Sequence, residues 1–191
     1  MIKPDGYDNV KAATFGSKID PGPYVMKIIS ADEVMSNNSG PMLVLCLDIA
    51  IGENKDHYKE MSNKYQKENY QKVRQLTGGA SLPYFKAMIE AIEESNNGFK
   101  FNFDEKTLVG KYVGANLREE EYINSNNELK TFLSVAYLCG ARKVVDGEIK
   151  PLPKKVLETN NHLPMQNSND DVVFEDVNTS FNNDRDDDLP F

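Results

Sequence analysis

The last ten residues of the chain cannot form a folded unit by themselves. Four aspartates fall within the five positions 184–188, and the chain then ends in Leu189, Pro190 and Phe191. Such a peptide repels itself and has almost no apolar surface to bury. Its aromatic end suits capture by another protein, in which basic side chains meet the aspartates and a pocket takes the phenylalanine. The alternative interpretation is a solvated, disordered terminus.

This ending resembles the C-terminal tip of single-stranded DNA-binding proteins of the bacterial and bacteriophage type. In that family an acidic tail ending in Pro-Phe recruits replication, recombination and repair proteins. The resemblance covers about the last eight residues of the chain. It implies that the aspartates supply the charge and that proline and phenylalanine form the buried anchor. The implied partner-docking tip consists of Asp186, Asp187, Asp188, Leu189, Pro190 and Phe191.

The acidity of the chain is concentrated in its C-terminal part. The net charge is −8, and the segment from Thr159 onward holds eight acidic residues against one arginine, so the body is nearly neutral. A DNA-mimic inhibitor would need acid spread over its folded surface, whereas a neutral body can bind nucleic acid through a local basic groove. Residues 160–183 are rich in Asn, Asp and Ser, as in flexible linkers. The sequence therefore predicts a folded domain over 1–158 and a flexible acidic tail over 159–191.

Four segments of the body have the composition of β-strands. They form two pairs, each joined by turn-forming residues, and they cover 24–34, 42–51, 111–122 and 129–138. A helix is expected between the two pairs, with Ser81 as its cap and Pro83 in its first turn. A short hairpin is expected over 144–149.

This order of elements predicts a mainly β fold with a helical insertion. It fits a five-stranded barrel of the oligonucleotide/oligosaccharide-binding (OB) type, and a β-sandwich is the alternative. The body also looks like phage-encoded single-stranded DNA-binding proteins of Gram-positive hosts, through segments 22–24, 39–42, 108–111 and 120–122. Bacterial members of the family rely on tryptophan for base stacking. Because this chain has no tryptophan, tyrosine and phenylalanine would have that role.

The first candidate DNA site is a segment in which cations and tyrosines alternate. Residues 55–74 hold six cationic and three acidic residues, and single strands are bound by basic grooves with rings on which bases stack. Tyr58, Met61 and Tyr65 also lie at helical spacing, so the alternative is the buried stripe of an amphipathic helix. The candidate contacts are Lys64, Tyr65, Lys67, Tyr70, Lys72 and Arg74.

The second candidate DNA site is a face of the sheet. Alternation along the strands places Tyr112 with Arg118 on one face, and Lys130 with Phe132 on one face of the partner strand. An exposed face with these four residues would be a stacking platform, whereas the alternative is that such aromatics belong to the core. Arg142 and Lys143 are expected to extend a basic rim.

We therefore expect a sequence-independent single-stranded DNA-binding protein. It would coat and protect DNA in phage replication and recombination and recruit partners through its tip. The sequence leaves open whether it associates with itself. The alternative is a replisome or recombination adaptor whose barrel binds protein. An enzyme is not expected, because residues 119–121 lack the spaced His, Lys or Asp partners of a metal-dependent nuclease and 77–80 lacks the lysine of a phosphate loop. The triple glutamate is instead interpreted as a solvated strand end, and no cofactor is expected.

Cys46 and Cys139 lie far apart in apolar segments without the spacing of metal ligands. We expect both to be reduced core residues of an intracellular protein. The longest apolar stretch, 42–51, is too short to cross a membrane and contains Asp48. A cytoplasmic protein is therefore expected, in the host cytoplasm if the gene belongs to a phage.

Overall fold

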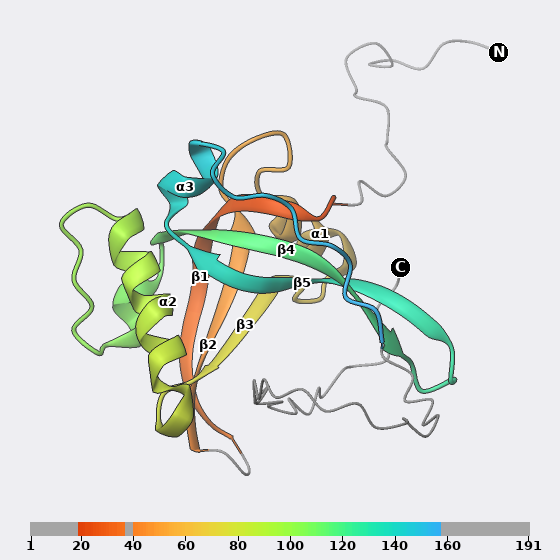
Figure 1. Ribbon diagram of the computed structural model, residues 1–191, viewed down its shortest axis with the longest axis horizontal. Helices are drawn as coiled ribbons and strands as arrows, with labels where there is room; N and C mark the ends of the chain where they lie inside the picture. Colours follow the sequence, from red (N-terminus) through yellow and green to blue (C-terminus); the bar gives the residue numbers. More distant parts are fainter. Residues whose placement is uncertain (1–18, 37–39, 158–191) are drawn as a thin grey trace, which may run out of the picture.

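The computed structural model describes residues 19–36 and 40–157. Five strands form one antiparallel sheet, with helices at its ends and on its outer side (Figure 1). In chain order the elements are β1 (Gly22–Ser36), β2 (Gly40–Ile49), α1 (His57–Tyr65), β3 (Gln71–Leu76), the 3-10 turn η1 (Gly79–Ser81), α2 (Leu82–Ser95), the 3-10 turn η2 (Glu105–Leu108), β4 (Tyr112–Ile123), β5 (Leu129–Cys139) and α3 (Ala141–Val145).

The sheet has the strand order β3-β2-β1-β4-β5, and every neighbouring pair is antiparallel. The four predicted strands are confirmed as β1, β2, β4 and β5, with ends that differ by a few residues. The mainly β fold with a helical insertion is likewise confirmed. The strand β3 was not located in the sequence, because its inward positions include Gln71 and Gln75 and so lack the apolar alternation that marks a half-buried strand.

The predicted barrel is not closed. Within the described residues β3 and β5 share no backbone ladder, although the sheet curls enough for the two strands to contact each other. Pairing of β1 with β4 ends at Gly22 and Leu117, whereas β4 and β5 stay paired out to Ile123 and Leu129. The outer part of this hairpin, residues 118–134, therefore projects from the body as a two-stranded arm (Figure 1). Since β3 has only six residues and part of β5 belongs to the arm, the two edges have little length over which to pair.

Alternate residues of the three central strands, β1, β2 and β4, form the core on the inner face of the sheet. The most completely buried are Met26, Ile28, Leu45, Leu47, Ile49, Val113, Ala115 and Leu117. The helix α2 covers this face with Phe85, Met88, Ala91 and Ile92, which recur at helical spacing.

The helix expected after Ser81 is confirmed as α2, but its start differs from the prediction. The Ser81 side chain makes no capping hydrogen bond, because the chain enters α2 directly from η1 and Ser81 is already helical. Pro83 lies in the first turn as expected. None of the helices in the described part of the chain is long and apolar enough to span a bilayer.

The hairpin expected over 144–149 is wrong. Residues Ala141–Val145 form α3, and the Asp146 N–H donates to the Arg142 carbonyl at 2.8 Å. Gly147 follows with φ of 73°, the left-handed conformation that commonly ends a helix. The Asp-Gly pair that suggested a hairpin turn therefore acts as a helix terminus.

The helix α3 packs on the outer side of β4, where Gly114 leaves it room. A Cβ at this position would lie 2.8 Å from Cys139 Sγ and 2.9 Å from both the Gly140 carbonyl oxygen and Val144 Cγ2. We predict that Gly114→Ala lowers the free energy of unfolding by about 1–3 kcal/mol, as overpacking does. The matched control is Gly78→Ala, because a Cβ there meets nothing within 4 Å. Urea denaturation of both variants tests this, and equal midpoints would contradict it.

Candidate nucleic-acid interface

Six of the ten predicted DNA contacts lie on the outer face of the curled sheet. Cross-strand partners share a face, so the register carries this face from Lys72 through Cys46 to Ser30, and from Lys27 to Tyr112. The opposite face is the apolar core. The six residues are Lys72 and Arg74 of β3, Tyr112 and Arg118 of β4, and Lys130 and Phe132 of β5.

One residue of this face was missed in the sequence. Lys27 is exposed and lies directly opposite Tyr112, whose side chain is 44% exposed. Its position between the buried Met26 and Ile28 is the signal that could have identified it, since a charged residue between two core residues must point outward.

The other four predicted contacts lie on α1 and on the connection from α1 to β3. Lys64 and Tyr65 end the helix, with Lys64 Nζ 5.2 Å from the centre of the tyrosine ring, and that ring is 41% exposed. Lys67 is half-buried on the connection. Tyr70 is half-buried as well and packs against the core, and burial raises the pKa of its hydroxyl.

Each of the two interpretations of the helical tyrosines holds for one of them. Tyr58 is only 8% exposed and belongs to the core, as the buried-stripe interpretation predicted. Tyr65 is exposed at the end of the same helix and is available for surface contact.

The curl of the sheet brings the candidate residues of α1, β3 and the arm toward one edge, whereas Tyr112 lies beside Asn96 at the end of α2. All neighbouring strands are antiparallel, so β3 and β5 run in the same direction, and Gln71 lies beside Leu133. We call the line where these two edges meet the seam. The connection before Gln71 therefore lies at the same end of the seam as the part of the arm that precedes Leu133.

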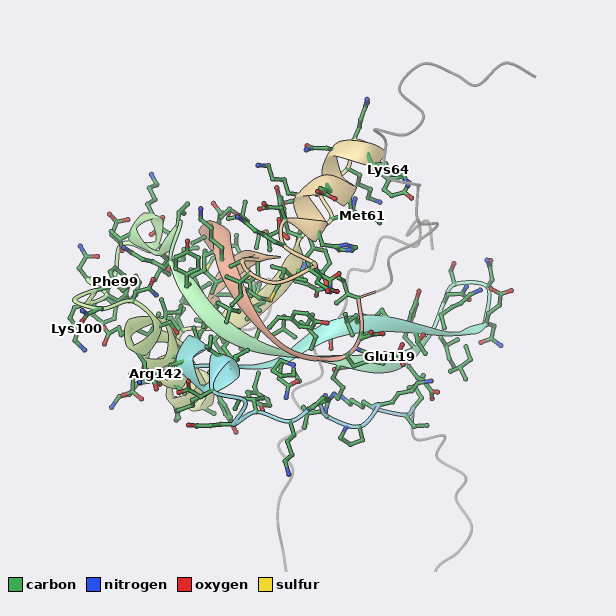
Figure 2. The ribbon with its side chains drawn as sticks, turned by 90° about the horizontal axis from the view of Figure 1, so that it is seen from above. Met61, Lys64, Phe99, Lys100, Glu119 and Arg142 are labelled. Carbon is green, nitrogen blue, oxygen red and sulfur yellow. The ribbon has the colours of Figure 1, made fainter. Side chains whose placement is uncertain are left out.

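Figure 2 supports this arrangement. Met61 and Lys64 of α1 lie in the same half of the long axis as Glu119 at the base of the arm. Phe99, Lys100 and Arg142 lie at the opposite end. The basic rim expected from Arg142 and Lys143 is therefore not part of this surface, and their side chains pair with Asp146 at 3.4 Å and with Glu94 at 3.5 Å.

Several cations of the interface are held by carboxylates. Lys72 pairs with Glu68 at 3.1 Å, and this hydrogen bond is the main cause that lowers the pKa of Glu68. Lys130 pairs in the same way with Glu128 at 3.0 Å. Within residues 19–36 and 40–157, no ion pair engages Lys64, Lys67 or Arg74. The same holds for Lys27, so these cations are not held by carboxylates of the described residues.

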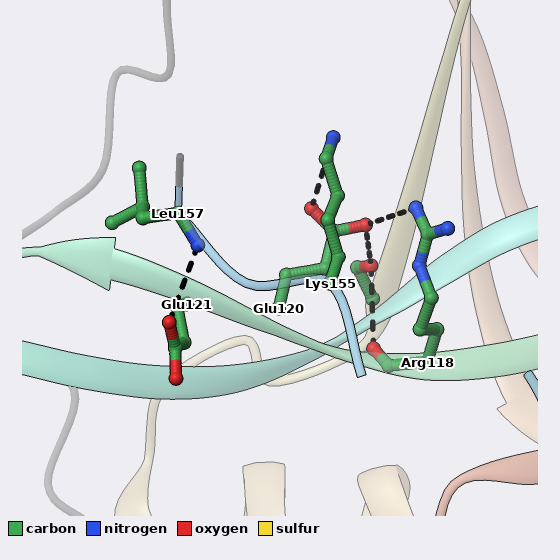
Figure 3. A network of polar contacts seen from close by, with 6 residues as sticks. Arg118, Glu120, Glu121, Lys155 and Leu157 are labelled. Atoms are coloured by element: carbon green, nitrogen blue, oxygen red, sulfur yellow. Dashed lines mark hydrogen bonds and ion pairs between the residues drawn. The ribbon is translucent and has the colours of Figure 1, made fainter. Parts of the chain in front are cut away.

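Arg118 is part of a polar network at the base of the arm (Figure 3). Its guanidinium donates to Glu120 Oε1 at 3.0 Å, and the Ser134 hydroxyl donates to the same oxygen at 2.7 Å. Burial would raise the pKa of Glu120, but the hydrogen bonds from Ser134 and Arg118 and the charge of Lys155 outweigh it and lower the pKa. The Arg118 side chain, which is 26% exposed, therefore helps to hold the two strands of the arm together at its base.

The triple glutamate holds residues 150–157, which we call the strap. The Lys155 N–H donates to the Glu119 carbonyl at 2.8 Å, and the Glu121 N–H donates to the Lys155 carbonyl at 2.9 Å. Lys154 Nζ lies 2.7 Å from Glu121 Oε1. The Leu157 N–H donates to the same carboxylate, as Figure 3 shows. The side chains of Glu120 and Glu121 are 19% and 12% exposed, so the interpretation of this segment as a solvated strand end is wrong.

Acid should release the strap. The hydrogen bond from Lys154 is the main cause that lowers the pKa of Glu121, and the Leu157 N–H adds to it. A carboxyl with a lowered pKa stabilises the closed strap above the ordinary glutamate pKa of about 4.3, and this stabilisation is lost as the pH falls through the folded value. The amide resonances of Leu157 and Lys155 should therefore shift toward unstructured positions at that pH. With Glu121→Gln the transition should weaken, and an unchanged transition would contradict this role.

Both cysteines are free, with Cys46 buried and Cys139 half-buried. Among the described residues no three His, Cys, Asp or Glu side chains are placed to hold a metal ion. The predicted docking tip, Asp186 to Phe191, lies outside the described residues.

No known protein-family model matches this chain, and no curated protein is significantly similar to it.

Proposed function

We propose that this protein binds single-stranded DNA without sequence preference. One observation carries the proposal: ten cations and aromatics from two separate parts of the sequence lie on one face of the sheet or on the elements that lead to its seam. A surface that alternates rings and cations is the kind that binds single strands, because every base has a flat face on which a ring can stack.

Each kind of side chain would have its own part in binding. Lys64, Lys67 and Arg74, which form no ion pair in the described part of the chain, would meet phosphates first. Lys72 and Lys130 would exchange their carboxylate partners for phosphates. The exposed rings of Tyr65 and Tyr112 would stack on bases, and such stacking contributes about 1–3 kcal/mol per base.

The open sheet supports the further proposal that the fold is a variant of the OB barrel. In a closed form of the observed strand order, β3 and β5 would be the pair that completes the ring, and α2 would lie between β3 and β4 in the chain. Proteins of that fold bind oligonucleotides across the second and third strands. The corresponding outer face here carries Lys72 and Arg74.

The protein would act in phage DNA replication or recombination, within the host cytoplasm, by coating exposed strands rather than by catalysis. The acidic tail would recruit partner proteins through Asp186, Asp187, Asp188, Leu189, Pro190 and Phe191. The resemblance of these residues to the tip of single-stranded DNA-binding proteins supports this part of the proposal.

Fluorescence anisotropy of the full chain with labelled oligonucleotides tests the central proposal. We expect similar affinities for poly-pyrimidine and mixed sequences, weaker binding of duplex, and an affinity that falls steeply with salt because counterions are released. If no oligonucleotide binds at low ionic strength, DNA binding is wrong and the adaptor function takes its place.

Removal of residues 184–191 should have two opposite effects. The acidic peptide competes with DNA for the cations of the interface, so its loss should tighten oligonucleotide binding while it abolishes partner capture. The matched control is Phe191→Ala, which keeps the aspartates and should abolish partner capture alone. Unchanged DNA affinity after the deletion would contradict the competition, and partner capture that survives it would contradict the docking role.

A further inference from the structure

The seam is joined by a side chain where a closed barrel would have a backbone ladder. Within residues 40–157, the hydrogen bond that links β3 to β5 is donated by Gln71 Nε2 to the Leu133 carbonyl, at 3.1 Å. Leu133 and Val135 also pack against the core, as Val73 does. Such apolar contacts are not directional, so they hold the two strands together without fixing how one lies beside the other.

The same amide also fixes α1. Gln71 points to the inner side of β3, opposite Leu47, and its Nε2 donates to the Tyr58 hydroxyl at 3.0 Å. Burial raises the pKa of Tyr58 to about 12 in spite of this hydrogen bond, so the hydroxyl stays neutral. One nitrogen of Gln71 therefore connects three elements, α1, β3 and β5.

The residues next to this link are the two halves of the candidate interface. Lys72 follows Gln71 in the chain and points to the outer face. Lys130 lies on the arm, three residues before Leu133. Lys64 and Tyr65 are carried by the helix whose Tyr58 accepts from Gln71. The spacing between these groups depends on where the seam is held.

We infer that Gln71 is a positioning residue of the DNA interface, holding α1, β3 and the arm in the arrangement that lets their cations meet one strand. This inference rests on the proposed DNA binding. It assigns Gln71 no contact with DNA, because its side chain lies on the inner side of the sheet.

The chemistry of the link requires an amide. A glutamate at position 71 has the same shape but has no N–H, so its carboxylate would face the Leu133 carbonyl as a second acceptor. An alanine would leave both acceptors without their donor. Gln75 supplies a matched control, because it lies on the same strand and face and donates to Leu76 and Ser81 instead of β5.

The first measurement needs no DNA. Spin labels are placed at Arg74 on β3 and Thr131 on the arm, after Cys46 and Cys139 are replaced by serine. We expect a narrow distance distribution in the parent protein and in Gln75→Ala, and a longer or broader one in Gln71→Ala and Gln71→Glu. An unchanged distribution in both Gln71 variants would overturn the inference whatever the protein binds.

The second measurement uses unlabelled full chains and an oligo-dT strand, at a temperature at which circular dichroism shows each variant folded. Gln71→Glu and Gln71→Ala should weaken binding about tenfold, because the free energy of ordering the seam, on the order of one hydrogen bond, is then subtracted from the free energy of binding, and Gln75→Ala should not. Lys130→Ala should weaken binding in the parent but have little effect in Gln71→Ala, whereas Arg74→Ala should weaken binding in both. A merely structural role would leave these effects independent.

The outcomes separate the two proposals. If the parent binds oligo-dT and the Gln71 variants bind equally well, the inference is wrong and DNA binding stands. If the parent does not bind oligo-dT at all, the proposed function is wrong, and the positioning role for DNA is wrong with it, even if the spin-label distance changes.

Discussion

Replacing Asp48 with alanine should lower the free energy of unfolding by at least about 3 kcal/mol, the largest stability effect we expect for one substitution in this protein. The Asp48 side chain is 1% exposed. Its Oδ1 accepts from the N–H groups of Ile49 at 2.8 Å and Tyr58 at 3.0 Å, and its Oδ2 accepts from the Lys59 N–H at 3.0 Å.

Two of these donors explain the size of the effect. The N–H groups of Tyr58 and Lys59 lie in the first turn of α1, where no carbonyl within the helix can reach them. The residue at the usual cap position, Asp56, makes no side-chain cap hydrogen bond. Asp48 therefore caps α1 from a strand, and alanine would leave two buried donors and one part-buried donor without an acceptor.

Asp48→Asn tests the hydrogen bond from the Lys59 N–H separately from the other two. An asparagine can keep its oxygen toward Ile49 and Tyr58, but its NH₂ group would then face the Lys59 N–H. We expect a loss of about 1–2 kcal/mol for this variant, smaller than for alanine. Chemical denaturation followed by circular dichroism measures both. If Asp48→Ala is as stable as the parent, the capping role is wrong.

Charge reversal on β3 should have the largest effect on DNA binding. With Lys72→Glu and Arg74→Glu combined, we expect the affinity for oligo-dT to fall by about 10- to 100-fold at low salt, because two phosphate contacts become repulsive. The slope of log affinity against log salt should become shallower by about 1.4, since each phosphate contact on a single strand contributes about 0.7. Anisotropy titrations at four or five salt concentrations give both quantities.

The control variant has the same net charge, but its two substitutions lie elsewhere on the molecule. Lys86→Glu with Arg142→Glu makes the chain equally more acidic, on α2 and α3, and Arg142 lies at the end of the molecule away from α1 (Figure 2). We expect only a small loss of affinity and an unchanged salt slope. Equal losses for the two double variants would mean that net charge, and not the β3 surface, governs binding.

Local patterns were enough to locate most of the secondary structure. Strand-like composition bounded by turn-forming residues marked β1, β2, β4 and β5, and apolar residues at helical spacing marked α2. The prediction failed where the pattern was ambiguous: β3 has glutamines on its inner face, and the Asp146-Gly147 pair suits a helix end as well as a hairpin turn. Both errors come from turns and polar positions whose meaning depends on their neighbours in space.

The candidate interface was predictable in its residues but not in its arrangement. Alternation correctly placed Tyr112 with Arg118 and Lys130 with Phe132 on a common face. It could not show that Ser134 joins the Arg118–Glu120 pair, or that the strap occupies the triple glutamate, because Ser134 is placed by the register of β5 and the strap is a segment far apart in sequence.

The sequence by itself determined four of the five strands, the main helix and the uneven distribution of charge, because each of these depends on residues close together in the chain. Only the tertiary structure decided that the sheet curls without closing and that β3 meets the arm. The hydrogen bond there joins residues 62 positions apart, Gln71 and Leu133, and no local pattern encodes a contact over such a separation. The position of the interface follows from this contact, since two basic segments become one surface only where the sheet brings its two edges together.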